Sequence, residues 1–447
     1  MARILIDTKE HLCECCSVQL SNQIYLKLIT QNTNKHIACD NVIAAFIYDY
    51  GTKEKHYFNF SHPDVIASSS YTDFVKLLKK TDREIYVNNK KRYKYFLNDC
   101  NLIDVNLFGF LKDNEVLVNE ESDAYFAIKI RMGDVNQFNI IYPYANHQRD
   151  FDQELIHIEN LNTENKDSYC FKFFNNIIAD TLFEVEKNGL KVDTSIFKNY
   201  FKAKTYDKFV YTEYNTYNPT GRPSNHFDNV NYVALNKEDG CRKSFVSRYD
   251  DGYLMMVDFT GFHPYIVANL IDYKVPDEET IYEHLAKQYY NVDRVDSDLM
   301  SKSKKLTMVN LYGQIKDQYL NIPFFAKTDE LKNKYWEMFT KKGYVTTPIY
   351  KRKITSKHIS DPNKNKLFAY IIQATETEYG LNSLGNVLKY VADKQIVPIL
   401  YVYDSIVFDV GPDVDEHTIQ DIIDIIKSKK FKVKVYTGNN YNDLKLR

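Results

Sequence analysis

The sequence predicts an α+β protein with more than one domain. Its 447 residues exceed what one compact domain usually holds, and 44% of them are hydrophobic, enough to bury real cores. Strand-like and helix-like stretches alternate up to about residue 165, and a mainly helical region with two apolar strands follows. The polar segment 160–166 is the predicted boundary, so we expect one domain over 1–165 and a second over 166–447.

The first region has the composition of a small α/β domain. Strands are expected at 42–48 and 56–60, paired around the turn at Gly51. Helical spacing of apolar residues covers 71–80 and 90–97, with a short strand at 84–87 between them. A further strand is expected at 138–147.

The second region begins with a helix at 169–188, which Gly189 ends because glycine readily adopts the left-handed conformation. An irregular, Asn-rich stretch follows at 215–236. We then expect a strand into Asp258, helices through Leu320, a basic β-like segment near Tyr344 and a helix at 364–392. A hairpin around Asp404, a helix at 416–429 and a strand at 430–436 complete the chain.

The net charge of −2 gives no general argument for a polyanionic partner. The segment 327–366 is nevertheless rich in cations with interleaved aromatic residues, a combination that can neutralise phosphates. A solvated lysine-rich surface explains the same pattern, and on charge alone it is the favoured explanation. The cations of this segment include Lys332, Lys334, Lys341, Lys342, Lys351, Arg352, Lys353 and Lys357.

The seven cysteines show no regular framework spacing. With no signal peptide and no apolar run of membrane-spanning length, a cytoplasmic location and no membrane partner are expected. His11, Cys13, Cys15 and Cys16 lie close together in the sequence. They lack a second pair at zinc-ribbon spacing, so a metal site is not predicted there.

Two short blocks each carry an aspartate on an apolar strand. In 254–259, LMMVDF, a buried strand would hold Asp258 rigidly at a site. In 399–408, ILYVYDSIVF, two apolar runs meet at Asp404, which indicates a tight hairpin with the acid at its turn. Aspartate is also common in ordinary surface turns, so neither block is decisive alone.

Between these blocks lies 304–313, KKLTMVNLYG. On a helix, Lys304, Met308 and Tyr312 recur every fourth residue and share one face. A cation, a soft apolar side chain and an aromatic ring could hold a phosphate, a sugar and a base in turn. Taken singly, the helix is better explained as an amphipathic core helix with a peripheral lysine.

In this order and spacing the three blocks resemble motifs A, B and C of family A DNA polymerases. The resemblance covers roughly residues 175 to 447, and further stretches resemble the supporting motifs of the family. These are EKNGLKVD at 186–193, TGR at 220–222, NVN at 229–231, RKSF at 242–245, GYVTT at 343–347 and QAT at 373–375.

The resemblance implies a right-hand polymerase fold. The palm would comprise 215–270 and 367–447, the fingers 271–366, and a much reduced thumb 190–215. Residues 1–165 lie where the family carries a 3′–5′ exonuclease domain. We expect that domain to be inactive, because DTKE at 7–10 is one residue too long for the acidic Asp-x-Glu pair and 88–97 is cationic where an acid is needed.

The implied activity is template-directed addition of deoxynucleotides to a primer 3′-end, with two Mg²⁺ ions held by Asp258 and Asp404. Lys304 would neutralise the triphosphate and could protonate the leaving group. The implied partners are primer-template DNA, deoxynucleoside triphosphates and a processivity factor that compensates for the reduced thumb. The expected nucleotide-binding residues are His263, Lys305, Met308, Tyr312 and Gly313, and the expected DNA-binding residues are Arg222, Asn229, Arg242 and Gln373.

Several positions depart from the family pattern. His263 replaces a glutamate that blocks a ribose 2′-hydroxyl, and Met308 replaces an aromatic residue that lines the sugar. Motif C reads Tyr403-Asp404-Ser405 instead of His-Asp-Glu, which removes one carboxylate. The bulk of His263 still favours deoxynucleotides as substrates, although the sequence leaves the sugar preference open.

Two other functions stay open. One is a single-subunit RNA polymerase or primase-like enzyme, which Met308, Tyr312 and Ser405 also resemble. The other is a non-catalytic polymerase-like subunit that binds nucleic acid, which the reduced thumb and the altered motif C favour. The compact, AT-rich coding pattern suggests a phage or virus as the source.

Overall fold

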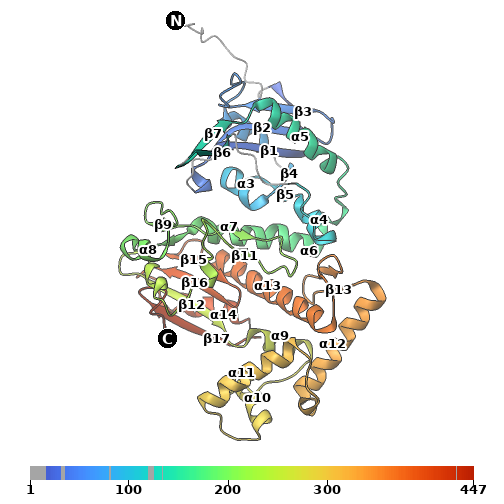
Figure 1. Cartoon of the computed structure of the whole chain (residues 1–447), viewed down its shortest axis with the longest axis vertical. Helices are drawn as coiled ribbons and strands as arrows, with labels where there is room; N and C mark the ends of the chain where they lie inside the picture. Colours follow the sequence, from blue (N-terminus) through green and yellow to red (C-terminus); the bar gives the residue numbers. More distant parts are fainter. Residues whose placement is uncertain (1–16, 32–35, 80–81, 119–124, 133, 429) are drawn as a thin grey trace, which may run out of the picture. The chain divides into compact units, whose positions relative to one another are not determined.

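The computed structural model describes residues 17–31, 36–79, 82–118, 125–132, 134–428 and 430–447. The chain divides into two compact units (Figure 1). The first comprises residues 1–110 and 115–166, and the second comprises 111–114 and 167–447. The segments 7–10 and 11–16, which carry the DTKE stretch and the His/Cys group, lie outside the described residues.

A five-stranded sheet with the order β3-β2-β1-β4-β5 forms the centre of the first unit. The strands β3, β2 and β1 are antiparallel, whereas β4 and β5 run parallel to β1. The strands are β1 (Gln23–Gln31), β2 (Asn41–Asp49), β3 (Lys55–Asn59), β4 (Glu84–Val87) and β5 (Leu102–Asp104). The strand pair predicted around the turn at Gly51 is thereby confirmed, and so is the short strand predicted at 84–87.

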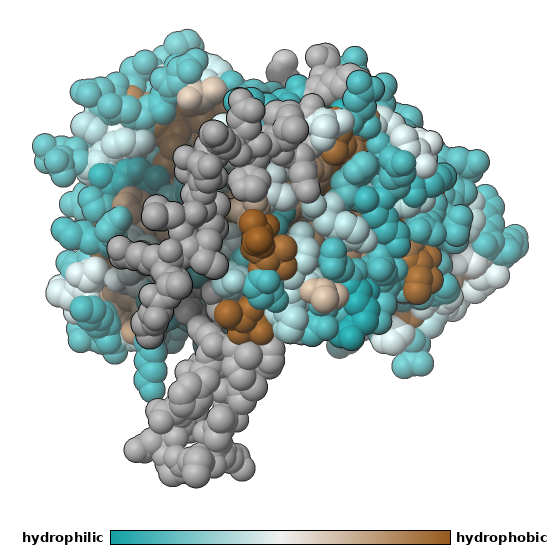
Figure 2. All heavy atoms as spheres, turned by 90° about the horizontal axis from the view of Figure 1, so that it is seen from above, coloured by the Kyte–Doolittle hydropathy of each residue, from teal (hydrophilic) through white to brown (hydrophobic). Residues whose placement is uncertain are grey.

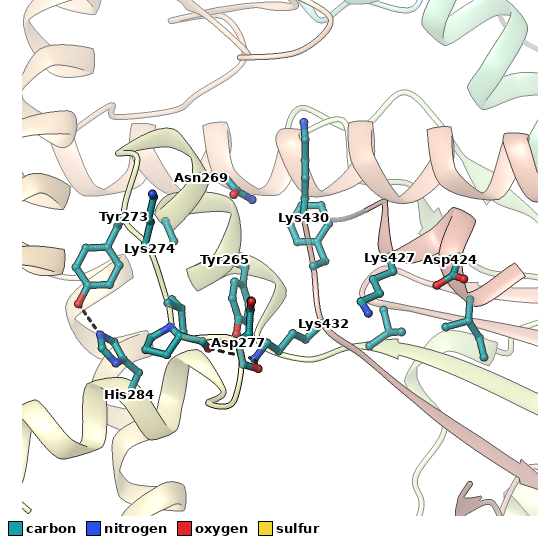
Figure 3. Close-up of a pocket in the computed structure, with 16 residues that line it drawn as sticks. Tyr265, Asn269, Tyr273, Lys274, Asp277, His284, Asp424, Lys427, Lys430 and Lys432 are labelled. Atoms are coloured by element: carbon teal, nitrogen blue, oxygen red, sulfur yellow. Dashed lines mark hydrogen bonds between the residues drawn. The ribbon is translucent and has the colours of Figure 1, made fainter. Parts of the chain in front are cut away.

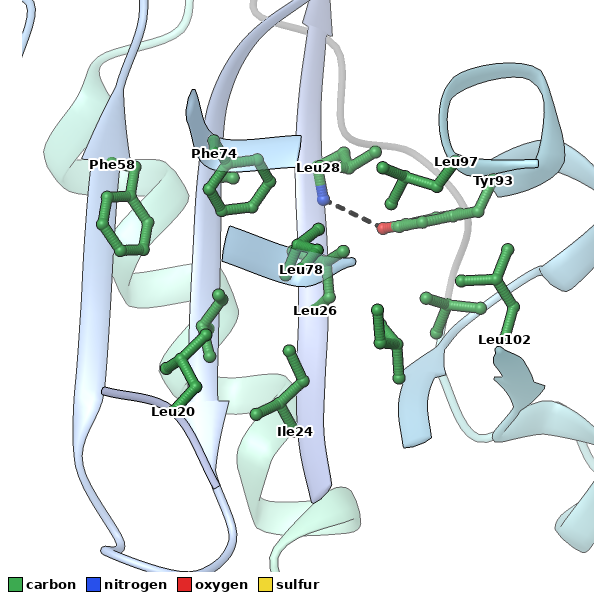
Figure 4. Packing of buried hydrophobic residues seen from close by; sticks show 14 residues of the cluster. Leu20, Ile24, Leu26, Leu28, Phe58, Phe74, Leu78, Tyr93, Leu97 and Leu102 are labelled. Atoms are coloured by element: carbon green, nitrogen blue, oxygen red, sulfur yellow. Dashed lines mark hydrogen bonds between the residues drawn. The ribbon is translucent and has the colours of Figure 1, made fainter. Parts of the chain in front are cut away.

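The two faces of β1 pack against different helices, because side chains alternate along a strand. Leu26 and Leu28 lie on one face in a core with Phe74 and Tyr93, which come from α2 (Tyr71–Leu78) and α3 (Lys90–Leu97) (Figure 4). The Tyr93 hydroxyl accepts a hydrogen bond from the Leu28 N–H. Tyr25, on the opposite face, stacks on Phe151 of α5 (Tyr144–Ile158).

The strand predicted at 138–147 is wrong in its second half. The hairpin β6 (Tyr125–Met132) and β7 (Asp134–Ile141) ends before Pro143, and α5 begins at Tyr144. Proline has no N–H to donate to a strand ladder but fits the start of a helix. The helix α4 (Asn106–Asp113) was not predicted either.

The second unit begins with a nearly continuous helix. It comprises α6 (Tyr169–Lys172), a π-helical stretch (Phe173–Ile178) and α7 (Ala179–Asn188), which confirms the helix predicted at 169–188. Gly189 ends it with a φ of +60°, as expected for glycine at this position. The short segments that follow are β8 (Leu190–Lys191), α8 (Thr194–Tyr200), β9 (Phe209–Val210), β10 (Tyr214–Asn215) and β11 (Ser224–Asn225).

A second five-stranded sheet, with the order β15-β16-β12-β17-β18, forms the centre of this unit. All of its neighbouring strands are antiparallel. The strands are β12 (Tyr253–Phe259), β15 (Ile396–Val402), β16 (Ser405–Val410), β17 (Val433–Gly438) and β18 (Lys445–Leu446). Two helices, α13 (Lys364–Tyr390) and α14 (Glu416–Lys427), pack on each other beside it (Figure 1). The expected hairpin around Asp404 is thereby confirmed.

A helical region lies between β12 and α13 in sequence. Its elements are α9 (Phe262–Leu270), α10 (Ile281–Tyr290), α11 (Ser297–Tyr312), α12 (Pro323–Lys342), β13 (Tyr344–Thr346) and β14 (Lys353–Thr355). Two cations of the basic segment, Lys332 and Arg352, are only 1% exposed. Because they are buried, they are not part of a solvated lysine-rich surface and cannot neutralise phosphates. Both predicted explanations of the basic segment are therefore wrong for these two residues.

Among the described residues, no helix is long and apolar enough to cross a bilayer. The face drawn in Figure 2 is mostly hydrophilic, with small separate hydrophobic patches.

Candidate functional site

The two aspartates of the sequence motifs lie side by side in the sheet of the second unit. Asp258, near the end of β12, is paired across the ladder with Ser405, which directly follows Asp404. The Phe259 N–H donates a hydrogen bond of 2.8 Å to the backbone carbonyl of Asp404. Backbone pairing therefore fixes both carboxylates at the same end of two neighbouring strands.

The surroundings of both carboxylates favour the binding of positive charge. Burial and the negative charge of Asp404 raise the pKa of Asp258 to about 6, while the charges of Lys304 and Lys434 oppose that rise. Asp404 keeps solvent-accessible surface, but partial desolvation and the charge of Glu376 raise its pKa as well. A cation between the two carboxylates would relieve this repulsion.

The hairpin turn that carries Asp404 has an unusual backbone. Val402 pairs with Ser405, which leaves Tyr403 and Asp404 as the two turn residues. Tyr403 has a φ of +55°, a left-handed conformation that is rare for a bulky residue. The Arg222 guanidinium lies over the Tyr403 ring, 3.7 Å from Cζ to the ring centroid, and supports it by a cation–π contact.

One face of α11 is directed toward this site. Lys304 lies 6.0 Å from the centroid of the Tyr282 ring, and the Tyr282 hydroxyl donates to Met308 Sδ at 3.9 Å. The hydroxyl of Tyr312, two turns after Lys304, is hydrogen-bonded to His263 Nδ1. The predicted stripe on α11 is therefore in contact with two other helices. Lys304 and Met308 face Tyr282 of α10, and Tyr312 contacts His263 of α9.

Glu376 joins this cluster from α13, and the sequence reasoning missed it. One carboxylate oxygen lies 3.0 Å from His263 Nε2, and the other lies 3.1 Å from Arg222 Nε. The side chain is only 1% exposed. A sequence signal was present, since an acid in the middle of a buried helix, three residues after Gln373, needs a cationic partner.

The loop that delivers Arg222 depends on the glycine before it. Gly221 has a φ of +77°, and a Cβ on it would stand 2.4 Å from Arg352 Nη1. The buried Arg352 cannot easily move away, because its Nη2 donates to the Pro219 carbonyl at 2.8 Å. Only glycine therefore fits between Thr220 and Arg222.

The other predicted site residues have the following surroundings. Lys305 is an exposed residue of α11, and Asn229 is exposed in a turn with a φ of +63°. Arg242 donates to the Leu235 carbonyl and lies over the Tyr441 ring, 4.7 Å from its centroid. Gln373 is a half-buried residue of α13.

Gly313 ends α11 and is held from α12. The Gly313 carbonyl accepts a hydrogen bond of 2.7 Å from Lys332 Nζ, which also donates to the Asn310 carbonyl at 3.1 Å. Burial lowers the pKa of Lys332 to about 8. Lys332 therefore caps the end of α11 and is not available to a nucleic acid.

A large open cavity lies elsewhere in the same unit. It has a volume of about 1350 Å³, and its walls come from α9, the segment 273–277, α10, the end of α14 and the segment between α14 and β17 (Figure 3). In it the Tyr273 hydroxyl contacts His284 Nε2 at 2.9 Å, and Lys432 Nζ donates to the Asp277 carbonyl at 2.5 Å. Its lining includes neither Asp258 nor Asp404, so this cavity is separate from the aspartate pair.

The aspartate pair has the chemistry of a magnesium site that is completed by its substrate. Mg²⁺ usually takes one or two carboxylates and fills its remaining positions with water and substrate phosphates. In the part of the chain that is described, no group of three or more His, Cys, Asp or Glu side chains could hold a metal. Asp258 and Asp404 thus fit Mg²⁺ bound together with a phosphate ligand, and do not fit a closed structural metal site.

Comparison with known proteins supports the fold. No protein-family model matches the sequence, and no curated protein matches it. Among solved structures, the chain is similar to the POL domain of Pol1 from M. smegmatis, which was solved in complex with a DNA primer-template and dNTP. The TM-score is 0.68 at 14% sequence identity, over 98% of this chain and 99% of that one. The chain therefore has the mixed α+β fold of a family A-like polymerase POL domain, which confirms the predicted resemblance at the level of the fold.

Proposed function

We propose that this protein is a template-directed DNA polymerase that adds deoxynucleotides to a primer 3′-end. The observation that carries the proposal is the pairing of β12 with β16, which brings Asp258 and Asp404 together. Lys304 supports it, because its charge acts on Asp258 from a different element. Two acids and a cation around one point suit phosphoryl transfer, in which negative charge builds up on the transferred group.

Each residue has a defined task in this mechanism. Asp258 and Asp404 would hold two Mg²⁺ ions, which when bound would neutralise phosphate charge and activate the primer 3′-hydroxyl. Lys304 binds the triphosphate at the start of the α11 stripe. Tyr312 and Met308 continue that stripe toward the base and the sugar of the nucleotide, and His263 blocks a 2′-hydroxyl.

The parts of the second unit take the roles of a right hand in this proposal. The sheet around β12 is the palm, and the region from α10 to β14 is the fingers. Between residues 190 and 230, all of which are described, α8 is the only helix and has seven residues. Such a short segment is a poor thumb, so we propose low processivity unless a partner protein clamps the DNA.

The first unit is proposed to be a non-catalytic module. On β1, the face toward α5 carries Tyr25 and Lys27, and both side chains hydrogen-bond to Glu154. Lys27 is 3% exposed, so its charge is used inside the unit. A cation paired with a single acid does not provide the clustered carboxylates that metal-dependent hydrolysis of a phosphodiester needs.

Primer extension tests the proposal directly. A labelled primer on a DNA template is incubated with Mg²⁺ and either deoxy- or ribonucleotides. We expect deoxynucleotide addition by the wild type and none by Asp258→Asn or Asp404→Asn. The matched control is Asp413→Asn, which removes an exposed aspartate in the loop after β16 and should extend as the wild type does.

The other outcomes separate the alternatives. Preferential ribonucleotide addition would indicate an RNA polymerase or primase-like enzyme. Binding of primed DNA without extension would indicate a non-catalytic subunit. Degradation of a single-stranded primer by the wild type, unaffected by Asp404→Asn, would contradict the proposed inactivity of the first unit.

A further inference from the structure

Glu376 is a buried carboxylate for which the reaction described above has no use. It lies in the middle of α13, and its side chain is 1% exposed. A buried carboxylate is costly unless it is paired, so a residue of this kind is retained for its contacts. Its neighbours Ala374, Thr375 and Thr377 are small or uncharged, and they are buried as well.

The contacts of Glu376 connect parts of the chain that are far apart in sequence. Arg222 Nε lies 3.1 Å from Oε2, and Arg222 also covers the ring of Tyr403 in the turn that carries Asp404. His263 Nε2 lies 3.0 Å from Oε1, and the Tyr312 hydroxyl is hydrogen-bonded to the other ring nitrogen of His263. One nitrogen of the His263 imidazole therefore faces a carboxylate of α13, and the other is hydrogen-bonded to Tyr312 of α11.

This arrangement argues against Glu376 as a third metal ligand. Each of its carboxylate oxygens faces a nitrogen, and a metal would have to displace one of them. Among the described residues, no set of three potential ligands is assembled around a point. Its place in the cluster fits a residue that positions others.

We propose that Glu376 determines the sugar selectivity of the polymerase by holding the His263 imidazole in one orientation. The proposal rests on the proposed function and deepens it. His263 lies five residues after Asp258, at the start of α9, and it is close enough to the aspartate pair to interact electrostatically with Asp404. An imidazole turns freely about two side-chain bonds unless its nitrogens have partners. Fixed between Glu376 and Tyr312, the ring is a rigid obstacle to a 2′-hydroxyl; released, it can turn aside.

Through Arg222, the Glu376 carboxylate also affects the hairpin turn that carries Asp404. Because Arg222 contacts both Glu376 and Tyr403, loss of the carboxylate also frees the side chain that covers the turn. A variant at Glu376 should therefore lose some overall rate in addition to selectivity. The ratio of the two substrates separates these effects, since a general loss of rate cancels in it.

The test is the discrimination ratio, kcat/KM for a deoxynucleotide over kcat/KM for the matching ribonucleotide. Glu376→Gln keeps the shape of the side chain and removes its charge. We expect the ratio to fall by about tenfold, because the His263 ring loses the charged partner that lies 3.0 Å from its Nε2. Tyr312→Phe, which removes only the hydroxyl on the other ring nitrogen, should lower the ratio in the same direction.

Glu378→Gln is the matched control. Glu378 is a second buried carboxylate on α13, two residues further on, and it accepts hydrogen bonds from Thr347 and from the Tyr350 N–H. Its replacement should leave the discrimination ratio unchanged. Fluorescence of Trp336, the only tryptophan of the chain, reports whether each variant folds. His263→Ala should lower the ratio too, and adding Glu376→Gln to it should lower the ratio no further.

The outcomes distinguish the inference from the function on which it rests. No extension by the wild type with either nucleotide would overturn the proposed function and this inference with it. Extension by the wild type together with an unchanged ratio in folded Glu376→Gln or Tyr312→Phe would overturn the inference alone. A further fall of the ratio when Glu376→Gln is added to His263→Ala would likewise show that Glu376 does not act through His263.

Discussion

Lys434 of β17 lies directly opposite Asp258 of β12 in the antiparallel ladder. Residues opposite each other point to the same face of a sheet with their Cβ atoms about 5 Å apart. The positive charge of Lys434 accordingly lowers the pKa of Asp258, against the upward effects of burial and Asp404. No motif of the sequence singled out this lysine.

Replacing Lys434 should therefore change the pH dependence of extension. In Lys434→Met the pKa of Asp258 rises, so the carboxylate is protonated at a higher pH than in the wild type. We expect the acid limb of the rate profile to move to higher pH. Lys445→Met, which removes an exposed lysine of β18 in the same sheet, is the control and should leave the limb in place.

Lys304 and Lys305 should differ although they are adjacent. Lys304 faces Tyr282 and acts on Asp258, whereas successive residues of a helix point about 100° apart. We expect Lys304→Met to reduce kcat/KM for the nucleotide by about 100-fold, as for loss of a preorganised charge at a transferring phosphate. Lys305→Met should have a much smaller effect in the same steady-state assay. Equal losses would contradict the assignment of Lys304 as the triphosphate-binding lysine.

Alanine substitutions at two glycines with nearly the same backbone conformation should distinguish the cost of backbone strain from the cost of a steric clash. Gly221 and Gly343 have φ of +77° and +76°, but a Cβ at Gly343 would meet nothing within 4 Å. Gly343→Ala should cost about 1 kcal/mol, the penalty of the left-handed conformation. Gly221→Ala should cost about 1–3 kcal/mol more, because its Cβ collides with the buried Arg352. Denaturant unfolding followed by Trp336 fluorescence measures both, and equal losses would show that Arg352 moves aside.

Stability should also depend on the ionisation of Glu378. Burial raises the pKa of Glu378 to about 7, despite hydrogen bonds from Thr347 and two backbone N–H groups. The contribution of the neutral acid to the free energy of unfolding is complete below the unfolded-state pKa of about 4.5 and is lost as the pH rises through 7. Between pH 5 and pH 8 the wild type should lose roughly 2–3 kcal/mol from this group.

Glu378→Gln removes that titration. Its free energy of unfolding relative to the wild type, again from Trp336 fluorescence, should therefore increase between pH 5 and pH 8. A constant difference across this range would mean that Glu378 is ionised in the folded protein at both pH values, with Arg352 as its counter-charge.

Much of the secondary structure around the site could be predicted because its signals are local. The apolar run before Asp258 and the two runs that meet at Asp404 specify strands through their own residues. Gly189 stops a helix by its own conformational freedom. The strand predicted at 138–147 failed where a local signal was misjudged, since Pro143 separates a strand from a helix.

The sequence by itself determined that Asp258 and Asp404 end apolar strands and that Lys304, Met308 and Tyr312 share a helix face. Only the tertiary structure decided which residues meet them. Glu376 pairs with Arg222 and His263 across 154 and 113 positions of chain, and Lys434 reaches Asp258 through the register of two strands. Helix and strand periodicities carry no information about such distant partners. The packing of α13 against α9 and the order of strands in the sheet set those contacts, and with them the charge around the aspartate pair.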